Sequence, residues 1–417
     1  MVVVIGGGAA GLVAAAFAAA GGADVLLIER TADGGRKILI SGGGRCNVLP
    51  SALAPERFVT DSPAHLLRGM LRAWPLHEQR AFFEHDLGIP LALEAESGKL
   101  FPRSNRARDI RDGLVTFARA RGVRMQFDTG VTGLDAADGG FTIATTDGPI
   151  HASRVVLATG GLSVPMTGSD GTGLRLATEL GHRMIDTYPA LTPLLGTGHD
   201  SLSGVSLNVR LRSKDGKRVI ETSGGFLFTH RGYSGPSVLD ISHVVTRRSD
   251  VASAFRRTNV ASGLSRTIRA QWSPFSAAWE KEFDVPSALV STVMAKHVSA
   301  RLAEQLMAEA AVPADRRTSA LRRTERLALI DRLTSYELPI TGDEGYKKAE
   351  VTGGGVALDE VDPRTLESRR CPGLYFCGEI LDAFGPIGGH NFAWAWATGR
   401  AAGLAAGRES EKSEVRS

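Results

Sequence analysis

The chain has 417 residues, of which 43% are hydrophobic and 23% are charged, and this composition excludes a largely disordered protein. The formal net charge of +4 is too small to indicate a nucleic-acid-binding protein by itself. Three scattered cysteines (Cys46, Cys371 and Cys377) exclude a disulfide framework, and no CxxC pair or Cys/His cluster indicates a metal site.

The first 30 residues predict a strand, a helix and a second strand. Residues 2–5 are an unbroken apolar run, residues 12–20 are rich in alanine, and residues 23–29 read ADVLLIE. No basic segment precedes this unit, and the apolar run at 12–20 is too short to cross a membrane. We therefore expect a cytoplasmic protein that begins with a dinucleotide-binding fold.

A glycine-rich turn joins the first strand to the helix. Residues 6–11 read Gly-Gly-Gly-Ala-Ala-Gly, which matches G-x-G-x-x-G in the position that the motif requires. Gly6 permits the turn, Gly8 lets the backbone approach a pyrophosphate, and Gly11 allows close packing of helix on strand. The helix N-terminus favours the diphosphate, and the carboxylate that ends the next strand favours ribose hydroxyls. The residues expected to contact the dinucleotide here are Gly6, Gly8, Ala9, Ala10, Gly11, Glu29 and Arg30.

Three later segments favour FAD over NAD as the bound dinucleotide. A glycine-rich loop at residues 34–47 gives main-chain N–H groups access to an extended flavin, with basic side chains near its anionic groups. Residues 155–161 predict a strand and a tight turn, and residues 378–391 lead into a C-terminal helix whose N-terminus would stabilise a reduced flavin. The cofactor residues expected from these segments are Arg36, Lys37, Ser41, Arg45, Thr159, Gly160, Gly378, Glu379 and Asp382.

The middle of the chain differs from both ends. Residues 208–270 contain 12 Lys and Arg against 4 Asp and Glu, a local charge of +8, while the rest of the chain sums to −4. Strand-like segments come first, and helical patterns follow at about residues 285–340. We therefore predict a nucleotide-binding domain at residues 1–190 and 350–410, interrupted by an inserted substrate or lid domain at residues 191–349.

Three sequence phrases give the chain a family resemblance: GRKILISGGGRCN (residues 35–47), YPALTPL (188–194) and GLYFCGEILDAFGPIGGHNFAWAWATG (373–399). Together they resemble the BaiN-type bacterial FAD flavoproteins, which include aminoacetone oxidase-like enzymes and a bile-acid enone reductase. The resemblance covers residues 2–403. It implies an α/β fold in which a Rossmann-like FAD-binding domain of the two-dinucleotide type is interrupted by a β-barrel-like part and a helical part. It also implies FAD contacts at Gly44, Cys46, Asn47, Val131, Gly389, His390, Asn391 and Phe392.

Two side chains in these segments are candidates for catalysis. Cys46 lies next to Arg45, and a nearby cation can lower the pKa of a thiol, although packing against the flavin is the favoured role for so small a residue. His390 is a candidate proton donor or flavin-edge contact, because an imidazole titrates near neutral pH. His390 also stands where the family is expected to have a tyrosine.

The motifs predict an FAD-dependent oxidoreductase in which the flavin carries the hydride. NAD(P)H is a candidate donor that would bind transiently, because only one G-x-G-x-x-G occurs. The favoured hypothesis is a reductase of an unsaturated or carbonyl compound. One alternative is an oxidase that passes electrons from an amine-type substrate to O₂, and the residues separate neither these two nor NADH from NADPH.

A third alternative, from a different class, is an RNA-associated flavoprotein, which the basic middle segment motivates. No RNA-binding motif accompanies that charge, so we expect no nucleic-acid partner and no membrane partner. The positive charge favours an anionic small-molecule substrate. Nothing in the sequence indicates the oligomeric state.

Overall fold

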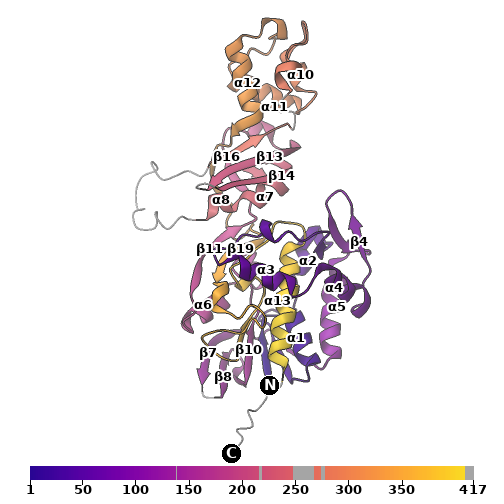
Figure 1. The fold of residues 1–417 in the computed structure, drawn as a ribbon, viewed down its shortest axis with the longest axis vertical. Helices are drawn as coiled ribbons and strands as arrows, with labels where there is room; N and C mark the ends of the chain where they lie inside the picture. Colours follow the sequence, from indigo (N-terminus) through magenta and orange to yellow (C-terminus); the bar gives the residue numbers. More distant parts are fainter. Residues whose placement is uncertain (138, 216–217, 248–266, 274–277, 409–417) are drawn as a thin grey trace, which may run out of the picture. The chain divides into compact units, whose positions relative to one another are not determined.

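The computed structural model describes residues 1–137, 139–215, 218–247, 267–273 and 278–408. The chain forms two compact units, which are described separately here (Figure 1). Unit 1 consists of Met1–Tyr188 and Glu350–Ser417, and unit 2 consists of Pro189–Ala349. The assignment of these units as cofactor and substrate domains stays a prediction.

A five-stranded parallel sheet with the order β20-β10-β1-β2-β6 lies at the centre of unit 1. The central strand is buried at all four positions, because a parallel sheet covered on both faces needs apolar residues throughout. The five strands are β1 (Val2–Ile5), β2 (Val25–Ile28), β6 (Arg124–Gln126), β10 (Arg154–Leu157) and β20 (Leu374–Phe376). Because β20 comes from the C-terminal part, segments far apart in the sequence complete the sheet.

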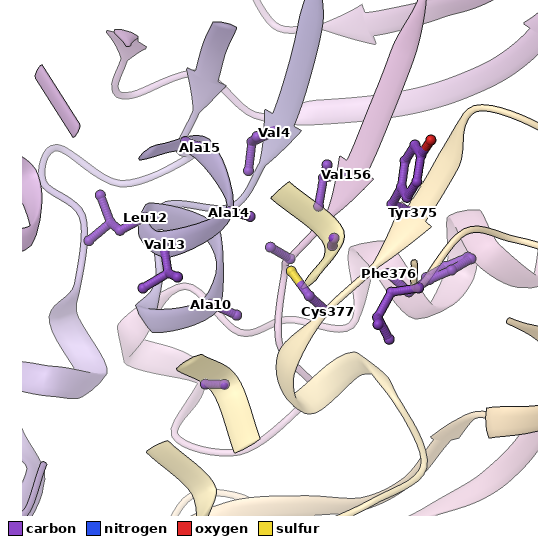
Figure 2. Packing of buried hydrophobic residues seen from close by; sticks show 14 of the residues in the cluster. Val4, Ala10, Leu12, Val13, Ala14, Ala15, Val156, Tyr375, Phe376 and Cys377 are labelled. Atoms are coloured by element: carbon purple, nitrogen blue, oxygen red, sulfur yellow. The ribbon is translucent and has the colours of Figure 1, made fainter. Parts of the chain in front are cut away.

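Helix α1 (Ala9–Ala20) packs its apolar side chains into the core of this sheet. Figure 2 shows Leu12 and Val13 of α1 in the same cluster as Val4 of β1 and Val156 of β10, and all four are buried. Burial of such side chains contributes roughly 1.5–3 kcal/mol each. This packing fixes the N-terminus of α1 beside the carboxyl ends of the strands.

Helix α13 (His390–Gly407) lies against α1 at very short range. Three glycines of α13, Gly399, Gly403 and Gly407, repeat every four residues and so share one face, which we call the glycine stripe. They lie opposite Ala10, Ala14 and Ala18 of α1, respectively. A Cβ on any of these glycines would lie 2.3–2.5 Å from a carbonyl oxygen of α1, which is impossible without separating the helices.

Smaller elements surround this core in unit 1. Two three-stranded sheets have the orders β3-β5-β4 and β7-β8-β9, and β11 pairs with β19. These strands are β3 (Leu49–Pro50), β4 (Leu91–Glu94), β5 (Lys99–Pro102), β7 (Val131–Ala137), β8 (Gly140–Thr145), β9 (Gly148–Ala152), β11 (Met184–Ala190) and β19 (Val351–Val356). The remaining α-helices are α2 (Arg36–Ile40), α3 (Ala64–Arg72), α4 (Leu76–Ala81), α5 (Ala107–Ala120) and α6 (Thr172–Glu179).

Unit 2 contains an antiparallel sheet with the order β17-β16-β13-β14-β15-β12-β18. Its strands are β12 (Leu194–Gly196), β13 (Ser206–Asp215), β14 (Arg218–Thr229), β15 (Gly232–Ser234), β16 (Ile268–Gln271), β17 (Tyr336–Glu337) and β18 (Ile340–Asp343). Its α-helices are α7 (Pro236–Ile241), α8 (His243–Thr246), α9 (Trp279–Glu282), α10 (Val290–Met294), α11 (Ala300–Glu309) and α12 (Arg323–Ser335). Unit 2 has a hydrophobic core of its own, which includes Phe226, Phe228 and Trp272. No helix in the described parts of either unit is long and apolar enough to span a membrane.

Candidate functional site

A cavity of about 730 Å³ lies in unit 1 at the carboxyl ends of the parallel strands. Its wall includes Ile5 at the end of β1 and, after the ends of β2, β10 and β20, Glu29, Thr159 and Gly378. In open α/β sheets, ligands bind in the crevice at this edge. The fold therefore places the glycine-rich turn of residues 6–11 and parts of the segments at residues 34–47 and 378–391 around one cavity.

The glycines of the 6–11 turn meet different spatial demands. Gly6 has φ +106°, and a Cβ there would lie 2.5 Å from the carbonyl oxygen of Ala158. Gly11 would place a Cβ 1.8 Å from the carbonyl oxygen of Gly6, so it is needed for packing. At Gly8, in contrast, a Cβ would meet no heavy atom within 4 Å, and Gly8 lines the cavity. A side chain at Gly8 would therefore occupy space that a ligand could use.

The N-terminus of α1 opens onto the same space. Its N-cap residue is Gly8, no side chain caps the helix, and Ala9 and Ala10 line the cavity. The first N–H groups of a helix have no partner within the helix, and together with the helix dipole they favour an anion. A diphosphate fits this cradle.

Glu29 is held rigidly at one end of the cavity. Its Oε2 accepts a hydrogen bond of 2.7 Å from the N–H of Gly7, and its Oε1 accepts bonds from the N–H and hydroxyl of Thr31 at 2.9 and 2.7 Å. A carboxylate has about four acceptor positions, so capacity remains for a ligand hydroxyl. This arrangement suits the ribose of an adenine nucleotide, and it identifies the adenosine end of the cavity.

A half-buried ion pair joins α2 to the segment that follows β20. Lys37 Nζ lies 2.8 Å from Glu379 Oε2, while Glu379 Oε1 accepts hydrogen bonds from the Ser163 hydroxyl at 2.7 Å and the Thr352 N–H at 3.0 Å. Burial alone would raise the pKa of Glu379, but the Lys37 charge and these hydrogen bonds outweigh it and lower the pKa. Glu379 is therefore ionised at neutral pH and joins three segments of the cavity wall.

Another part of the cavity wall is formed by the start of α13. Gly388 and Gly389 adopt left-handed backbone conformations, with φ of +102° and +96°. The Asn391 side chain accepts a hydrogen bond from the Gly385 N–H and donates one to the Gly385 carbonyl, both at 2.9 Å. This double contact fixes the loop that precedes α13. This segment is distinct from the diphosphate cradle and from the surroundings of Glu29, so it is the part of the cavity wall available to a flavin ring.

Most of the predicted cofactor residues line this cavity. They are Gly6, Gly8, Ala9, Ala10, Glu29, Arg30, Arg36, Lys37, Ser41, Asn47, Val131, Thr159, Gly160, Gly378, Glu379, Gly389, Asn391 and Phe392. The structure places the remaining predicted residues outside the cavity wall. They are Gly11, Gly44, Arg45, Cys46, Asp382 and His390.

The prediction that a cation lowers the Cys46 pKa is wrong. Arg45 Nη1 bonds to Glu94 Oε1 at 3.0 Å, and the Arg45 guanidinium lies 4.0 Å from the centre of the Phe101 ring. Cys46 is fully buried, and burial raises the pKa of its thiol to about 12, although a hydrogen bond with Ser41 opposes that shift. A protonated, enclosed thiol is not a nucleophile at neutral pH, so packing explains Cys46.

His390 also differs from its predicted role. Its side chain is only 5% exposed and lies edge-on to Phe58, with ring centres 6.0 Å apart. The pKa of His390 is lowered to about 4, mainly by burial and also by the charge of Arg57, while a hydrogen bond with the backbone of Ile387 opposes the shift. The imidazole is therefore neutral near pH 7, where a proton donor would need to be charged.

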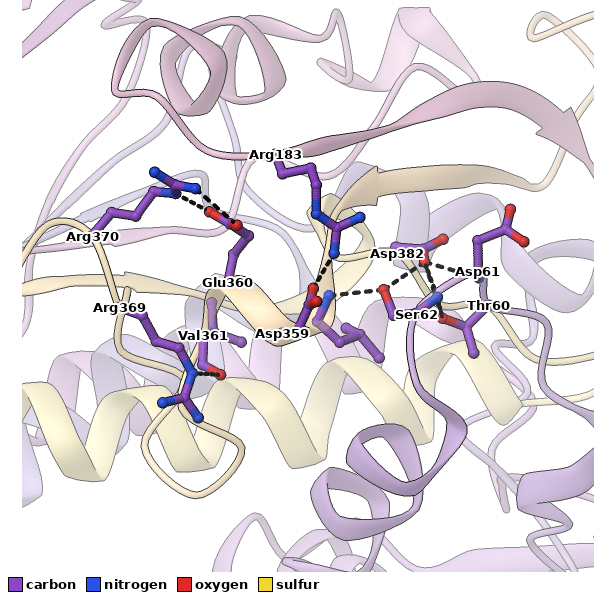
Figure 3. A network of polar contacts seen from close by, with 11 residues as sticks. Thr60, Asp61, Ser62, Arg183, Asp359, Glu360, Val361, Arg369, Arg370 and Asp382 are labelled. Carbon is purple, nitrogen blue, oxygen red and sulfur yellow. Dashed lines mark hydrogen bonds and ion pairs between the residues drawn. The ribbon is translucent and has the colours of Figure 1, made fainter. Parts of the chain in front are cut away.

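The Asp382 carboxylate holds the segment at residues 60–62 in place by hydrogen bonds. Its Oδ2 accepts hydrogen bonds from the Thr60 hydroxyl, the Asp61 N–H and both the N–H and hydroxyl of Ser62, at 2.8–3.0 Å (Figure 3). Ser62 Oγ in turn accepts a bond from the Leu358 N–H at 2.9 Å. The 2% exposed carboxylate thus joins the segment before α3 to the segment after β19 and does not face the cavity.

The cavity wall also contains residues that the sequence did not single out. Thr129 and Gly168 lie beside Glu29, and Lys99 of β5 lies beside Gly388. The other additional wall residues near them are Gly130, Thr132, Ser169, Asp170 and Thr172. Arg30, which also lines the cavity, forms an ion pair with Asp170. None of these positions belongs to a glycine motif, and Lys99 lies in a short strand that no local pattern marks.

The residues present fit FAD. The uncapped helix N-terminus accepts a diphosphate, Glu29 accepts ribose hydroxyls, and the cavity continues past the diphosphate cradle to the start of α13. When bound, FAD supplies hydride transfer, and this chain supplies binding, orientation and electrostatics.

Curated relatives match the chain over most of its length. It is 32% identical over 373 residues to a ribosomal RNA dihydrouridine synthase of Escherichia coli, covering 87% of each chain. It is 31% identical over 388 residues to a 3-dehydro-bile acid delta(4,6)-reductase of Clostridium scindens, covering 91% of each chain.

Solved structures include a 3-ketosteroid-delta4-(5alpha)-dehydrogenase of Rhodococcus jostii RHA1, 17% identical, with a TM-score of 0.47, covering 98% of this chain and 96% of that one. The family model described as HI0933-like protein Rossmann domain matches residues 1–405. With a cavity built for a dinucleotide and a family match over almost its entire length, the chain is a member of the HI0933-like family of FAD-dependent oxidoreductases.

Proposed function

We propose that this protein uses reduced FAD to add a hydride and a proton across a carbon–carbon double bond conjugated with a carbonyl group, and that its substrate is uridine in RNA. The observation that carries the proposal is the match to a ribosomal RNA dihydrouridine synthase over 87% of each chain. Dihydrouridine is uridine with its C5–C6 double bond reduced, and that bond is conjugated with the C4 carbonyl.

The second relative supports the reaction class independently. The name of the C. scindens enzyme describes reduction of double bonds conjugated with a 3-oxo group. Two relatives with unlike substrates therefore share one electronic requirement, which is hydride addition to a carbon made electrophilic by a distant carbonyl. This common chemistry favours the reductase hypothesis over the amine oxidase.

The charge of unit 2 supports a polyanionic substrate. Residues 189–349 contain 23 Lys and Arg against 16 Asp and Glu, a net charge of +7, while the rest of the chain carries −3. Lys214, Arg218, Lys347 and Lys348 are exposed cations of this unit. Neutralisation of phosphates by such side chains supplies sequence-independent affinity for RNA. The RNA-associated alternative therefore replaces the small anionic substrate as our proposal.

The direct test incubates the FAD-loaded protein and NADH or NADPH with unmodified ribosomal RNA transcripts. Nucleoside mass spectrometry then measures dihydrouridine. We expect its formation to depend on the reduced nicotinamide and to fall steeply as salt rises. Reduction of a free 3-oxo-4-ene with no activity on RNA would instead assign the protein to small-molecule reduction.

Charge reversal provides the matched comparison. Lys214→Glu combined with Arg218→Glu changes two exposed cations of unit 2, and Arg119→Glu changes an exposed cation of α5 in unit 1. The double variant should raise the KM for RNA about tenfold or more, without changing FAD content. Equal effects of both variants would contradict a role for unit 2 in RNA binding.

A further inference from the structure

One cation in the wall of the cavity differs from the others. The basic residues of the wall are Arg30, Arg36, Lys37, Lys99 and Arg175. Four of them have carboxylate partners: Arg30 pairs with Asp170, Arg36 with Asp33, Lys37 with Glu379 and Arg175 with Glu179. Lys99 forms no ion pair or side-chain hydrogen bond within the described part of the chain. Its charge is therefore not neutralised by direct contact.

The Lys99 side chain lies against the loop that begins α13. A Cβ on Gly388 would lie 3.2 Å from Lys99 Cε and 3.5 Å from Lys99 Cγ. Gly388 thus leaves room for the aliphatic stem, and its φ of +102° also favours glycine. The backbone of Lys99 is held on both sides in the sheet, by Pro50 of β3 and by Glu94 of β4. The ammonium group is therefore carried by a fixed strand.

Glu94 is the carboxylate that faces Lys99 across the β4–β5 pair. Its oxygens accept hydrogen bonds from Ser97 and Arg45. These bonds are the main reason that its pKa is lowered, and the charge of Lys99 contributes only last among the favourable causes. The negative charge of Glu94 is therefore balanced mainly by Arg45. The positive charge of Lys99 remains available to a ligand in the cavity.

The position of Lys99 assigns it to one part of the cofactor. Glu29 marks the adenosine end, and the N-terminus of α1 marks the diphosphate. Lys99 lies against Gly388 in a separate part of the wall, the loop that leads into α13, which is the part left for the flavin ring. The N-terminus of α13 begins at the same end and adds a partial positive charge.

We propose that Lys99 is a functional residue of the flavin site, whose ammonium stabilises negative charge on the isoalloxazine ring. Reduction of the ring by a hydride leaves a negative charge over its pyrimidine part, and a fixed cation in a partly enclosed cavity stabilises that charge. The inference rests on FAD binding by the family and not on the proposed RNA substrate. Lys99 therefore raises the reduction potential of the bound flavin.

Sulfite provides a test that needs no substrate. Sulfite donates its lone pair to the oxidised ring, so that an S–N bond forms at N5 and the displaced electron pair leaves a negative charge on the pyrimidine part. We expect Lys99→Met to weaken sulfite binding about tenfold and to lower the flavin reduction potential. Sulfite affinity follows from loss of flavin absorbance on titration, and the potential from equilibration with a reference dye.

Three variants define the comparison. Lys99→Arg keeps the charge and should keep both properties near those of the wild type. Arg175→Met removes a wall cation that is already paired with Glu179, and it should change neither. Lys99→Gln replaces Lys99→Met if the latter loads FAD poorly.

Wild-type sulfite affinity and potential in the Met and Gln variants would overturn the proposal. So would equal losses in the Arg variant, because these would indicate packing and not charge. A loss of FAD binding from all three Lys99 variants would likewise overturn it. These outcomes leave the RNA proposal untouched, since none of them measures a substrate.

Discussion

At Gly8 a Cβ would enter open cavity, whereas at Gly11 it would lie 1.8 Å from a backbone oxygen of the same turn. The motif predicts glycine at both positions, and the structure shows that one borders open cavity while the other is required by backbone packing. The same distinction separates Glu379, which lines the cavity, from Asp382, which does not. Both follow β20 in the sequence, and hydrogen bonding to residues 60–62 decides the role of the second.

Gly8→Val should therefore remove FAD while leaving the fold intact. The valine side chain would occupy the diphosphate cradle, and its backbone conformation (φ −77°, ψ −169°) is one that valine adopts. We expect the ratio of flavin absorbance to protein absorbance to fall at least tenfold, with a melting temperature close to that of wild-type apoprotein. Gly69→Val, at an exposed position of α3 where a Cβ also meets nothing within 4 Å, is the matched control and should retain FAD. Normal flavin content in Gly8→Val would show that the turn does not hold the diphosphate.

His390 should destabilise the folded protein in acid. The unfolded chain takes up a proton as the pH falls through 6.5, whereas the folded chain resists until about pH 4. The contribution of the neutral imidazole to the free energy of unfolding is fully present above pH 6.5. It decreases between pH 6.5 and pH 4, by up to about 3 kcal/mol. Urea unfolding at about pH 7 and about pH 4.5 should show a smaller loss for His390→Leu than for the wild type. The exposed His65 provides the control, and an equal loss in His65→Leu and His390→Leu would contradict this account.

At the scale of elements, the sequence predicted the long, patterned segments well. The apolar runs at residues 2–5 and 23–29 became β1 and β2, and the helix predicted between them, with its N-terminus near Ala9, is α1 (Ala9–Ala20). The strands β3, β4 and β5, of two to four residues each, were not predicted, because so short a segment shows no alternation of apolar and polar residues. Lys99 was not predicted either, although it lies in the cavity wall.

The glycine stripe gives a prediction for helix packing. Gly403→Ala should lower the free energy of unfolding by about 1–3 kcal/mol, because the new methyl group would lie 2.3 Å from the Ala14 carbonyl oxygen. Gly69→Ala, in the interior of α3 with open space around it, should instead raise stability by about 0.5–1 kcal/mol. Chemical denaturation measures both. A stabilised Gly403→Ala would mean that the two helices are not in close contact.

At the scale of the whole molecule, every residue that lines the cavity belongs to unit 1. Unit 2 has a separate hydrophobic core and a net charge of +7, whereas the rest of the chain carries −3. The sequence predicted an insertion from the return of strand-then-helix patterning near residue 373. It could not reveal the substrate, because the charge of unit 2 is compatible with many anions and no motif narrows the choice.

Replacing residues 191–348 with a short Gly/Ser linker should give a protein that still binds FAD but has lost its substrate. The cavity wall remains complete in such a chain, and β11 can still pair with β19. Flavin fluorescence on heating measures the cofactor, and dihydrouridine formation measures the substrate. Loss of FAD from a chain that keeps a cooperative unfolding transition would show that unit 2 contributes to the cofactor site.

The glycine stripe also sets the moment at which the cofactor site can exist during synthesis. The diphosphate cradle at α1 is made within the first 20 residues, but α13, which lies against it, is made only after residue 390. The fifth strand of the sheet, β20, is also among the last elements to be made. In a growing chain the site is therefore incomplete until Gly407 has left the ribosome. Until then, the surfaces of β1 and α1 that pack against α13 and β20 in the folded protein lack these partners.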